Sequence, residues 1–149
     1  MRAYVCAGAG FLLAVLWFDL MHDVQVLRPR AGADQADAVR SIARYYRRVT
    51  TDARPMNRLV SLAMVATVAA IVVELARDSV PAWVGWTSLV LAVAPISLAA
   101  RRTVRNAVRL GADVDALTPG HEAMARSIGR DHVFCLVSIA GLLAVQLAG

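Results

Sequence analysis

Residues 56–76 read MNRLVSLAMVATVAAIVVELA, an apolar run with one charge near each end. A run of this kind supplies the roughly 17–25 residues that a helix needs to cross about 30 Å of hydrocarbon. Three further runs of similar character occupy residues 3–20, 80–100 and 131–149. The chain is therefore predicted to be all-α, an integral membrane four-helix bundle in which residues 1–149 form a single four-span domain.

The composition of the whole chain agrees with a membrane protein. Of its 149 residues, 58% are hydrophobic and 18% are charged, whereas soluble domains average about 45–50% apolar and about 25% charged residues. The mean hydropathy is +0.56. All 16 basic residues are arginines, and the net charge is +5. In a membrane protein such an excess sets the orientation, so we expect no nucleic-acid partner.

The arginines fall almost entirely on one side of the predicted bundle. Four spans place both chain ends on one side and the two long connections, 24–55 and 101–130, on the other. Counting the span ends, the connection side carries 14 arginines against nine acidic residues, and the terminal side carries two of each. The positive-inside rule predicts a cytoplasmic arginine-rich face, both termini outside, and a multi-pass protein of the inner (plasma) membrane.

The first long connection is predicted to contain an amphipathic helix. Over residues 34–49, apolar residues recur at three- and four-residue steps, while arginines occupy another face. Such a helix is expected to lie in the headgroup layer, with its arginines toward anionic lipid headgroups. In an alternative interpretation, part of this connection closes over a pocket; the residues are Tyr45, Arg47, Arg48 and Arg54.

The second long connection carries signals for the end of one helix and the start of another. The third span is expected to continue as a helix to Leu110 and to stop at Gly111. Thr118 followed by Pro119 predicts a new helix that runs into the fourth span. Both connections are thus expected to form short helices over the cytoplasmic mouth of the bundle.

Ionisable residues are predicted to gather at this cytoplasmic mouth. Asp19, His22 and Asp23 lie three and four residues apart near the end of the first span, so they can share one helical face. Asp131 and His132 begin the fourth span at a similar depth. Ionisable residues at membrane depth are costly and mark functional sites, so these five residues are the candidates for catalysis.

Three kinds of chemistry fit this group. In the first, carboxylate and imidazole groups coordinate a divalent metal such as zinc, iron or manganese, the one cofactor that the sequence suggests. The metal ligands would be Asp19, His22, Asp23 and His132. In the second, no metal is present and an Asp–His pair transfers protons. In the third, the residues are structural, and Asp131 pairs with Arg102 or Arg130.

Two hypotheses for function follow. The first is binding or transformation of a lipophilic, anionic small molecule that enters from the inner leaflet. The five candidates above would do the chemistry, and the substrate-binding residues would be Arg54, Arg102 and Arg105. The second is a non-catalytic accessory or scaffold subunit, in a homo-oligomer or a larger membrane complex. In both, the lipid bilayer with its anionic headgroups is a partner.

Overall fold

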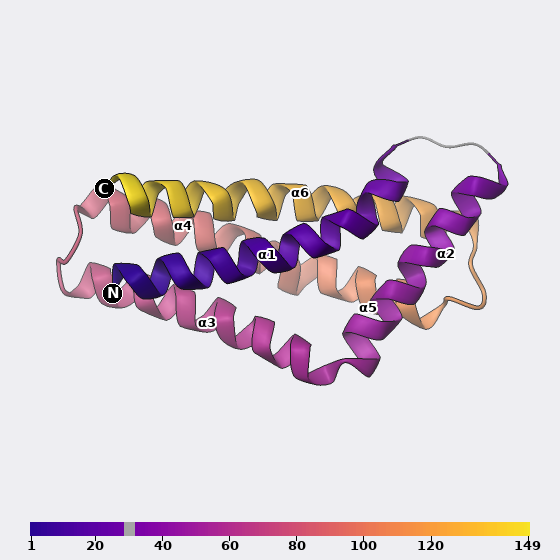
Figure 1. Ribbon diagram of the computed structural model, residues 1–149, viewed down its shortest axis with the longest axis horizontal. Coiled ribbons are helices and arrows are strands. Elements are labelled where there is room, and N and C mark those ends of the chain that lie inside the picture. The colour runs from indigo at the N-terminus through magenta and orange to yellow at the C-terminus, as the bar shows by residue number, and fades with distance from the viewer. Residues whose placement is uncertain (29–31) are drawn as a thin grey trace.

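Four long helices make up most of the molecule. The computed structural model describes residues 1–28 and 32–149, and for Ala33 and Arg54 the backbone alone. This part of the chain is helical, without a strand, and four of its helices are long and apolar enough to cross a membrane. Three of them are α1 (Arg2–Leu27), α3 (Arg54–Ala76) and α6 (Pro119–Ala148) (Figure 1). The fourth is the continuous helix Ala82–Ala112, which begins with α4 (Ala82–Leu98). The predicted all-α bundle is confirmed.

Shorter helices collect at one end of the bundle, called here the loop end. The N- and C-termini lie together at the opposite end, the terminal end (Figure 1). The first short helix, α2 (Ala33–Arg47), continues into the π-helical turn η1 (Arg48–Asp52). Helix α4 continues through a second π-helical turn, η2 (Ala99–Thr103), into α5 (Val104–Ala112). π-Helical turns are rare in proteins overall, and those that occur are often at functional sites.

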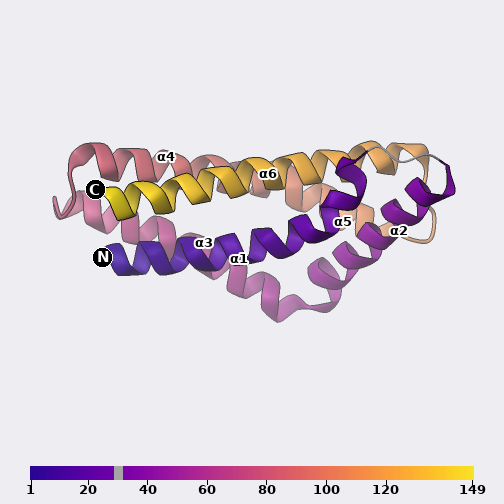
Figure 2. The same cartoon turned by 45° about the horizontal axis from the view of Figure 1, so that its top comes forward.

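Two buried apolar clusters hold the helices together. Helix α6 packs against both α1 and α4, and α3 packs against the same two helices (Figures 1 and 2). One cluster fills the membrane-crossing part of the bundle and includes Leu12, Ile71 and Leu142. The other fills the loop end and includes Ile42 of α2 and Leu110 of α5. The space between the two clusters contains the polar residues described below.

The outer surface of the long helices is apolar. Leu62, Val65, Trp86, Val137 and Leu147 are between 61% and 69% exposed. In a soluble protein so many large exposed apolar side chains would be a liability. In a bilayer, acyl chains cover them, while the helices satisfy their own backbone hydrogen bonds.

Helix α1 extends further than the predicted span 3–20. It continues to Leu27, because Asp23 and Val26 are buried against other helices of the loop end. One face of its C-terminal part is therefore covered by protein, while Met21 and Val24 on another face stay exposed.

Helix α6 begins at Pro119, as the Thr118–Pro119 pair predicts, and runs without a break into the fourth span. Thr118 caps it: the side chains of Thr118 and His121 each bond the other residue's backbone in a reciprocal cap. The long helix brings the residues before position 131 into the bundle.

Helix α2 forms where the periodicity predicts it, but protein covers its apolar face. Val39, Ile42 and Tyr46 are buried in the loop-end cluster, where α2 packs against α5 and α6. Arg40 and Arg44 are on the exposed side. The helix is thus part of the bundle, and the expected contact of its arginines with anionic headgroups remains a prediction.

Gly111 has a packing role that its predicted role as a helix stop does not describe. Helix α5 ends at Ala112, one residue past the predicted stop, and such boundaries vary by one or two residues. A Cβ atom on Gly111 would lie 2.6 Å from the backbone nitrogen of Arg47. The missing side chain therefore allows α5 to approach the backbone of α2 closely.

Candidate functional site

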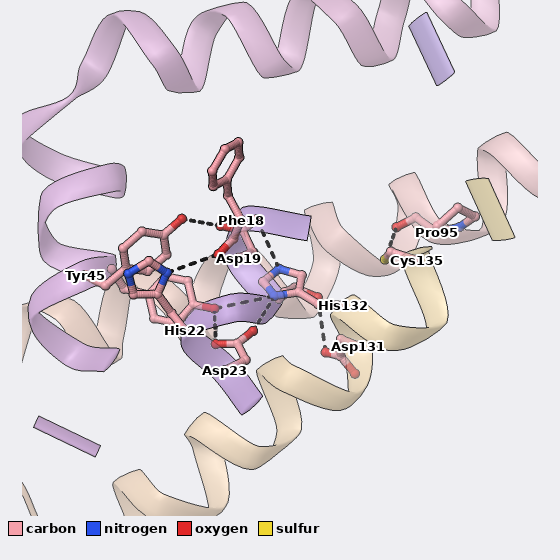
Figure 3. A network of polar contacts seen from close by, with 11 residues as sticks. Phe18, Asp19, His22, Asp23, Tyr45, Pro95, Asp131, His132 and Cys135 are labelled. Carbon is pink, nitrogen blue, oxygen red and sulfur yellow. Dashed lines mark hydrogen bonds and ion pairs between the residues drawn. The ribbon is translucent and has the colours of Figure 1, made fainter. Parts of the chain in front are cut away.

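The candidate site lies where α1 and α6 pass each other between the two apolar clusters. Asp19 and Asp23 are one turn apart on α1, and both carboxylates reach His132 of α6 (Figure 3). One turn before His132, a Cβ atom on Gly129 would lie 3.3 Å from the Cβ of Asp23. The glycine lets the two helices come close at this level, which brings the three side chains together.

Asp23 is the most deeply held member of the site. Its side chain is fully buried. Oδ2 of Asp23 lies 2.6 Å from Nδ1 of His132, and Oδ1 accepts a hydrogen bond of 2.7 Å from the hydroxyl of Tyr46. Both carboxylate oxygens are therefore engaged. With the proton of a neutral imidazole on Nδ1, facing Asp23, the lone pair of His132 is on Nε2.

Asp19 forms the second half of the site with Tyr45. The hydroxyl of Tyr45 donates a hydrogen bond of 2.6 Å to Oδ1 of Asp19. The other carboxylate oxygen, Oδ2, lies 3.9 Å from Nε2 of His132. His132 is thus placed between two carboxylates, one on each ring nitrogen. An imidazolium formed at this position would be stabilised by both.

His22 lies at the edge of the site and supports Tyr45. The two rings stack with their centroids 3.9 Å apart and their planes 11° from parallel. Nδ1 of His22 lies 3.1 Å from the backbone carbonyl oxygen of Phe18 (Figure 3). The ring therefore positions the tyrosine but does not join the carboxylates and His132.

The two tyrosines are held as neutral hydrogen-bond donors. Burial raises the pKa of both phenols, Tyr45 and Tyr46, above the ordinary value. The carboxylates of Asp19 and Asp23 raise each pKa further, because a phenolate beside a carboxylate is repelled. Each hydroxyl therefore keeps its proton at physiological pH and directs it to a carboxylate.

A cavity of about 470 Å³ adjoins this group. Its walls are mainly apolar and come from all four long helices, the two π-helical turns and the two short helices. Members of the apolar wall include Leu12, Leu16, Val60, Met64, Ile96 and Ile139. Asp19, Tyr45 and His132 also line the cavity. Along α1 and α6 the lining changes from apolar residues toward the terminal end to these polar ones toward the loop end.

Asp131 belongs to a separate set of contacts. Its Oδ2 accepts a hydrogen bond of 3.1 Å from Oγ1 of Thr103 and lies 3.5 Å from Nε of Arg102. Arg102 also donates to the hydroxyl of Ser127. This pairing agrees with the interpretation of Asp131 as a structural residue, and the structure does not bring it to the other four candidates.

Two of the three arginines expected to hold an anion, Arg102 and Arg105, do not line the cavity. Arg102 pairs with Asp131, and Arg105 is exposed. No arginine is among the described residues that line the cavity. The side chain of the third expected residue, Arg54, lies outside the described residues.

The expected metal ligands do not form a metal-binding group. Within residues 1–28 and 32–149, no three or more His, Cys, Asp or Glu side chains are arranged to hold an ion. Asp19, Asp23 and His132 are close, but their facing atoms contact one another or tyrosine hydroxyls. His22, the fourth expected ligand, faces Tyr45 instead.

Tyr46 is the residue of the site that sequence analysis missed. The periodicity of residues 34–49 places it among the apolar positions of the helix, and it is indeed buried. A signal was available, because a buried tyrosine hydroxyl nearly always needs a hydrogen-bond partner. The aspartates expected at the cytoplasmic mouth, Asp19, Asp23 and Asp131, were the available acceptors.

Comparison with known proteins identifies no relative of this chain. No protein-family model, no curated protein and no solved structure matches it. Fold class alone says little about activity, since four-helix bundles serve many unrelated functions. The functional argument therefore depends on the geometry of the site.

Proposed function

We propose that this protein binds a lipophilic small molecule in the cavity and removes a proton from its polar head group. The observation that carries the proposal is the apolar cavity of about 470 Å³ that reaches His132, whose ring is held by buried Asp23. A pocket with apolar walls and a few convergent polar groups is the usual form of a small-molecule site. The base and the residue that orients it have the arrangement common to enzymes with an activated histidine.

The proposed step moves one proton. The O–H of the head group donates to Nε2 of His132, which is placed to take that proton as the head-group oxygen reacts, so that no free alkoxide is left beside Asp19. The imidazolium that forms is stabilised by Asp23 at Nδ1 and by Asp19 near Nε2. Asp23 is therefore a positioning residue, and His132 is the catalytic base. Tyr45 fixes the Asp19 carboxylate, and His22 supports Tyr45.

The lining favours a head group that donates a hydrogen bond. Asp19 offers acceptor oxygens to the cavity, and an anionic head group would be repelled by it. No described arginine lines the wall to offset that repulsion. The arginine pattern of the sequence favours an anion, whereas these contacts favour a neutral alcohol or a similar donor. The two alternatives can be separated by experiment.

The orientation of the molecule forms part of the same proposal. The loop end carries most of the arginines, which favours a cytoplasmic loop end and termini outside an inner (plasma) membrane. Met56 and Asn57 of α3 line the cavity and are also exposed. Since both lie near the loop end of α3, they favour entry of the ligand from the inner leaflet.

A photoreactive alcohol tests the proposal directly. The probe is decan-1-ol with a diazirine near the chain end, added to protein in phosphatidylcholine nanodiscs and mapped by peptide mass spectrometry. We expect labelling of cavity residues that decan-1-ol competes away better than decanoate. His132→Gln should lower labelling by up to about tenfold, because a lost hydrogen bond between neutral groups costs about 0.5–1.5 kcal/mol and about 1.4 kcal/mol is tenfold. Met64→Trp should also lower labelling, because the larger side chain occupies the cavity that Met64 lines.

The matched control is Asp131→Asn, which changes the neighbouring residue on α6. Asp131 contacts Thr103 and Arg102 rather than Asp19, Tyr45 or His132. This variant should label like the wild type, and helix content and melting temperature confirm that each variant folds. Labelling that survives both His132→Gln and Met64→Trp would disprove the site. Competition by decanoate alone, lost in Arg102→Gln, would instead support the anionic ligand and overturn the head-group assignment.

A further inference from the structure

A second buried polar cluster lies toward the terminal end of the bundle, away from the cavity. It consists of Glu74 on α3, Ser88 on α4 and Gln146 on α6, with exposures of 1%, 0% and 0%. Nε2 of Gln146 donates two hydrogen bonds of 3.0 Å, one to Oε2 of Glu74 and one to Oγ of Ser88. One amide group therefore joins three helices.

Two oxygen atoms of this cluster are buried without a hydrogen-bond partner. They are Oε1 of Glu74 and Oε1 of Gln146. The Glu74 carboxylate and the Gln146 amide are already joined by the hydrogen bond from Nε2 of Gln146 to Oε2 of Glu74. An ionised carboxylate has acceptors only, as does the amide oxygen, so neither can satisfy the other. Buried acceptors without partners are rare in folded proteins.

A single proton removes the conflict, and we propose that Glu74 is a proton-binding site whose proton is shared with Gln146. The protonated carboxyl donates from Oε1 to the amide oxygen while Oε2 accepts from the amide nitrogen. This acid–amide pair has two hydrogen bonds between two planar groups and satisfies both unpartnered oxygens. The inference uses none of the residues of the cavity and does not depend on the proposed function.

The surroundings of Glu74 supply no positive charge to stabilise the ionised form. No ion pair to Glu74 is present among the described residues, and its polar side-chain contact is Gln146. The core near it is apolar, with Ile71 of α3 and Leu142 of α6 fully buried. The charged side chains of this end lie on the exposed surface; they are Arg2 of α1 and, after α3, Arg77 and Asp78. Helix α4 contributes no charged side chain. Burial of an unpaired charge in such a setting is costly.

Infrared spectroscopy can observe this proton directly. The measurement is the difference spectrum between wild type and Glu74→Gln in nanodiscs at pH 7, where the C=O stretch of a protonated carboxyl is separate from carboxylate bands. We expect the wild type to show one acid band that Glu74→Gln lacks. In Gln146→Leu this band should move to higher frequency, because the carbonyl loses its amide donor.

Glu74→Gln should also fold, since a second amide can offer the same donor and acceptor as the protonated acid. The matched control is Asp78→Asn, which changes an exposed acid near the same end and should leave the acid band in place. Loss of a carboxylate band in Glu74→Gln, with no acid band, would overturn the proposal. An acid band that disappears on addition of sodium at constant pH would also overturn it, in favour of a cation site.

Discussion

Tyr45 and Tyr46 are neighbours on α2, and their hydroxyls donate hydrogen bonds to different carboxylates at different depths. Tyr46 is 2% exposed and donates to fully buried Asp23, whereas Tyr45 is half-buried. We expect Tyr46→Phe to lower the free energy of unfolding by about 1.5–3 kcal/mol, the range for a hydrogen bond to a charged group. Tyr45→Phe should cost less, because water can replace its hydroxyl. Denaturant titration in mixed micelles measures both losses.

Tyr4→Phe is the control for that comparison, because Tyr4 is 71% exposed. It should leave the free energy of unfolding unchanged within about 0.5 kcal/mol, as surface substitutions usually do. Equal losses for Tyr46→Phe and Tyr4→Phe would mean that the bond to Asp23 contributes nothing to stability.

The raised pKa values of the two phenols predict how the protein responds to alkali. A group whose pKa is raised by folding contributes stability that is fully present below its unfolded pKa, about 10 for tyrosine. That contribution is lost as the pH rises through the higher folded-state pKa. Wild type and the double variant Tyr45→Phe/Tyr46→Phe should therefore show the same growth of phenolate absorbance up to about pH 11 while folded. When both proteins are unfolded in denaturant, the wild type should ionise two more phenols than the double variant. A difference in phenolate absorbance between the two folded proteins near pH 10 would contradict the assignment.

The polar residues of the site could be predicted in part from the sequence. Asp19, Asp23 and His132 were expected together because spacing and depth agree. His22 was expected with them. Successive residues of a helix are rotated by about 100° about its axis, so His22 lies about 60° from Asp19 on one side, while Asp23 lies on the other side of Asp19. Whether the His22 side or the Asp23 side of α1 faces α6 depends on the rotation of α1 about its axis. That rotation is set by packing, at contacts such as Asp23 against Gly129, and spacing alone does not contain it.

At the level of elements, the contact between α2 and α5 gives a test with a matched control. Gly111→Ala would place a Cβ atom 2.6 Å from the backbone of Arg47, and backbone cannot move aside as a side chain can. We expect a loss of about 1–3 kcal/mol in the free energy of unfolding, the usual cost of overpacking. Faster amide exchange in α2 should accompany it.

Gly10→Ala is the control, since nothing lies within 4 Å of a Cβ atom there. In a helix interior this change should be neutral or stabilise by up to about 1 kcal/mol, because alanine favours helix over glycine. A Gly111→Ala variant as stable as Gly10→Ala would show that α2 and α5 do not pack this closely.

Helix existence was predictable from hydrophobic periodicity, but what covers each helix was not. The pattern of residues 34–49 fits a helix on a lipid surface and a helix on a protein core equally well, because both need one apolar face. Long-range contacts decide between them, and here Leu110 and Ile128 complete the core beneath α2. The extension of α1 past Leu20 has the same origin, since its polar residues find buried partners on other helices.

In the molecule as a whole, the buried polar groups lie at two separate levels of an apolar bundle. Toward the loop end, Asp23 and His132 adjoin a cavity. Toward the terminal end, Glu74 and Gln146 are enclosed by helices. Apolar side chains supply little driving force for helix association within lipid, so buried hydrogen bonds help to specify which helices pair. The first group also has space beside it for a ligand, which is why we assign the proposed chemistry there.

The unequal distribution of arginine makes the orientation a prediction for the whole molecule. Because 14 of 16 arginines belong to the loop end and the helix segments beside it, the positive-inside rule places that end in the cytoplasm. Two single-cysteine variants test this in a Cys6→Ser/Cys135→Ser background without altering any charge: Ser79→Cys in the turn after α3, and Ala116→Cys in the connection before α6. Both positions are exposed. In intact cells a membrane-impermeant maleimide should label the Ser79→Cys variant alone, and permeabilised cells should show both labelled. The opposite pattern would place the arginines outside and the mouth of the cavity at the outer leaflet, and a ligand from the inner leaflet would then have no route to His132.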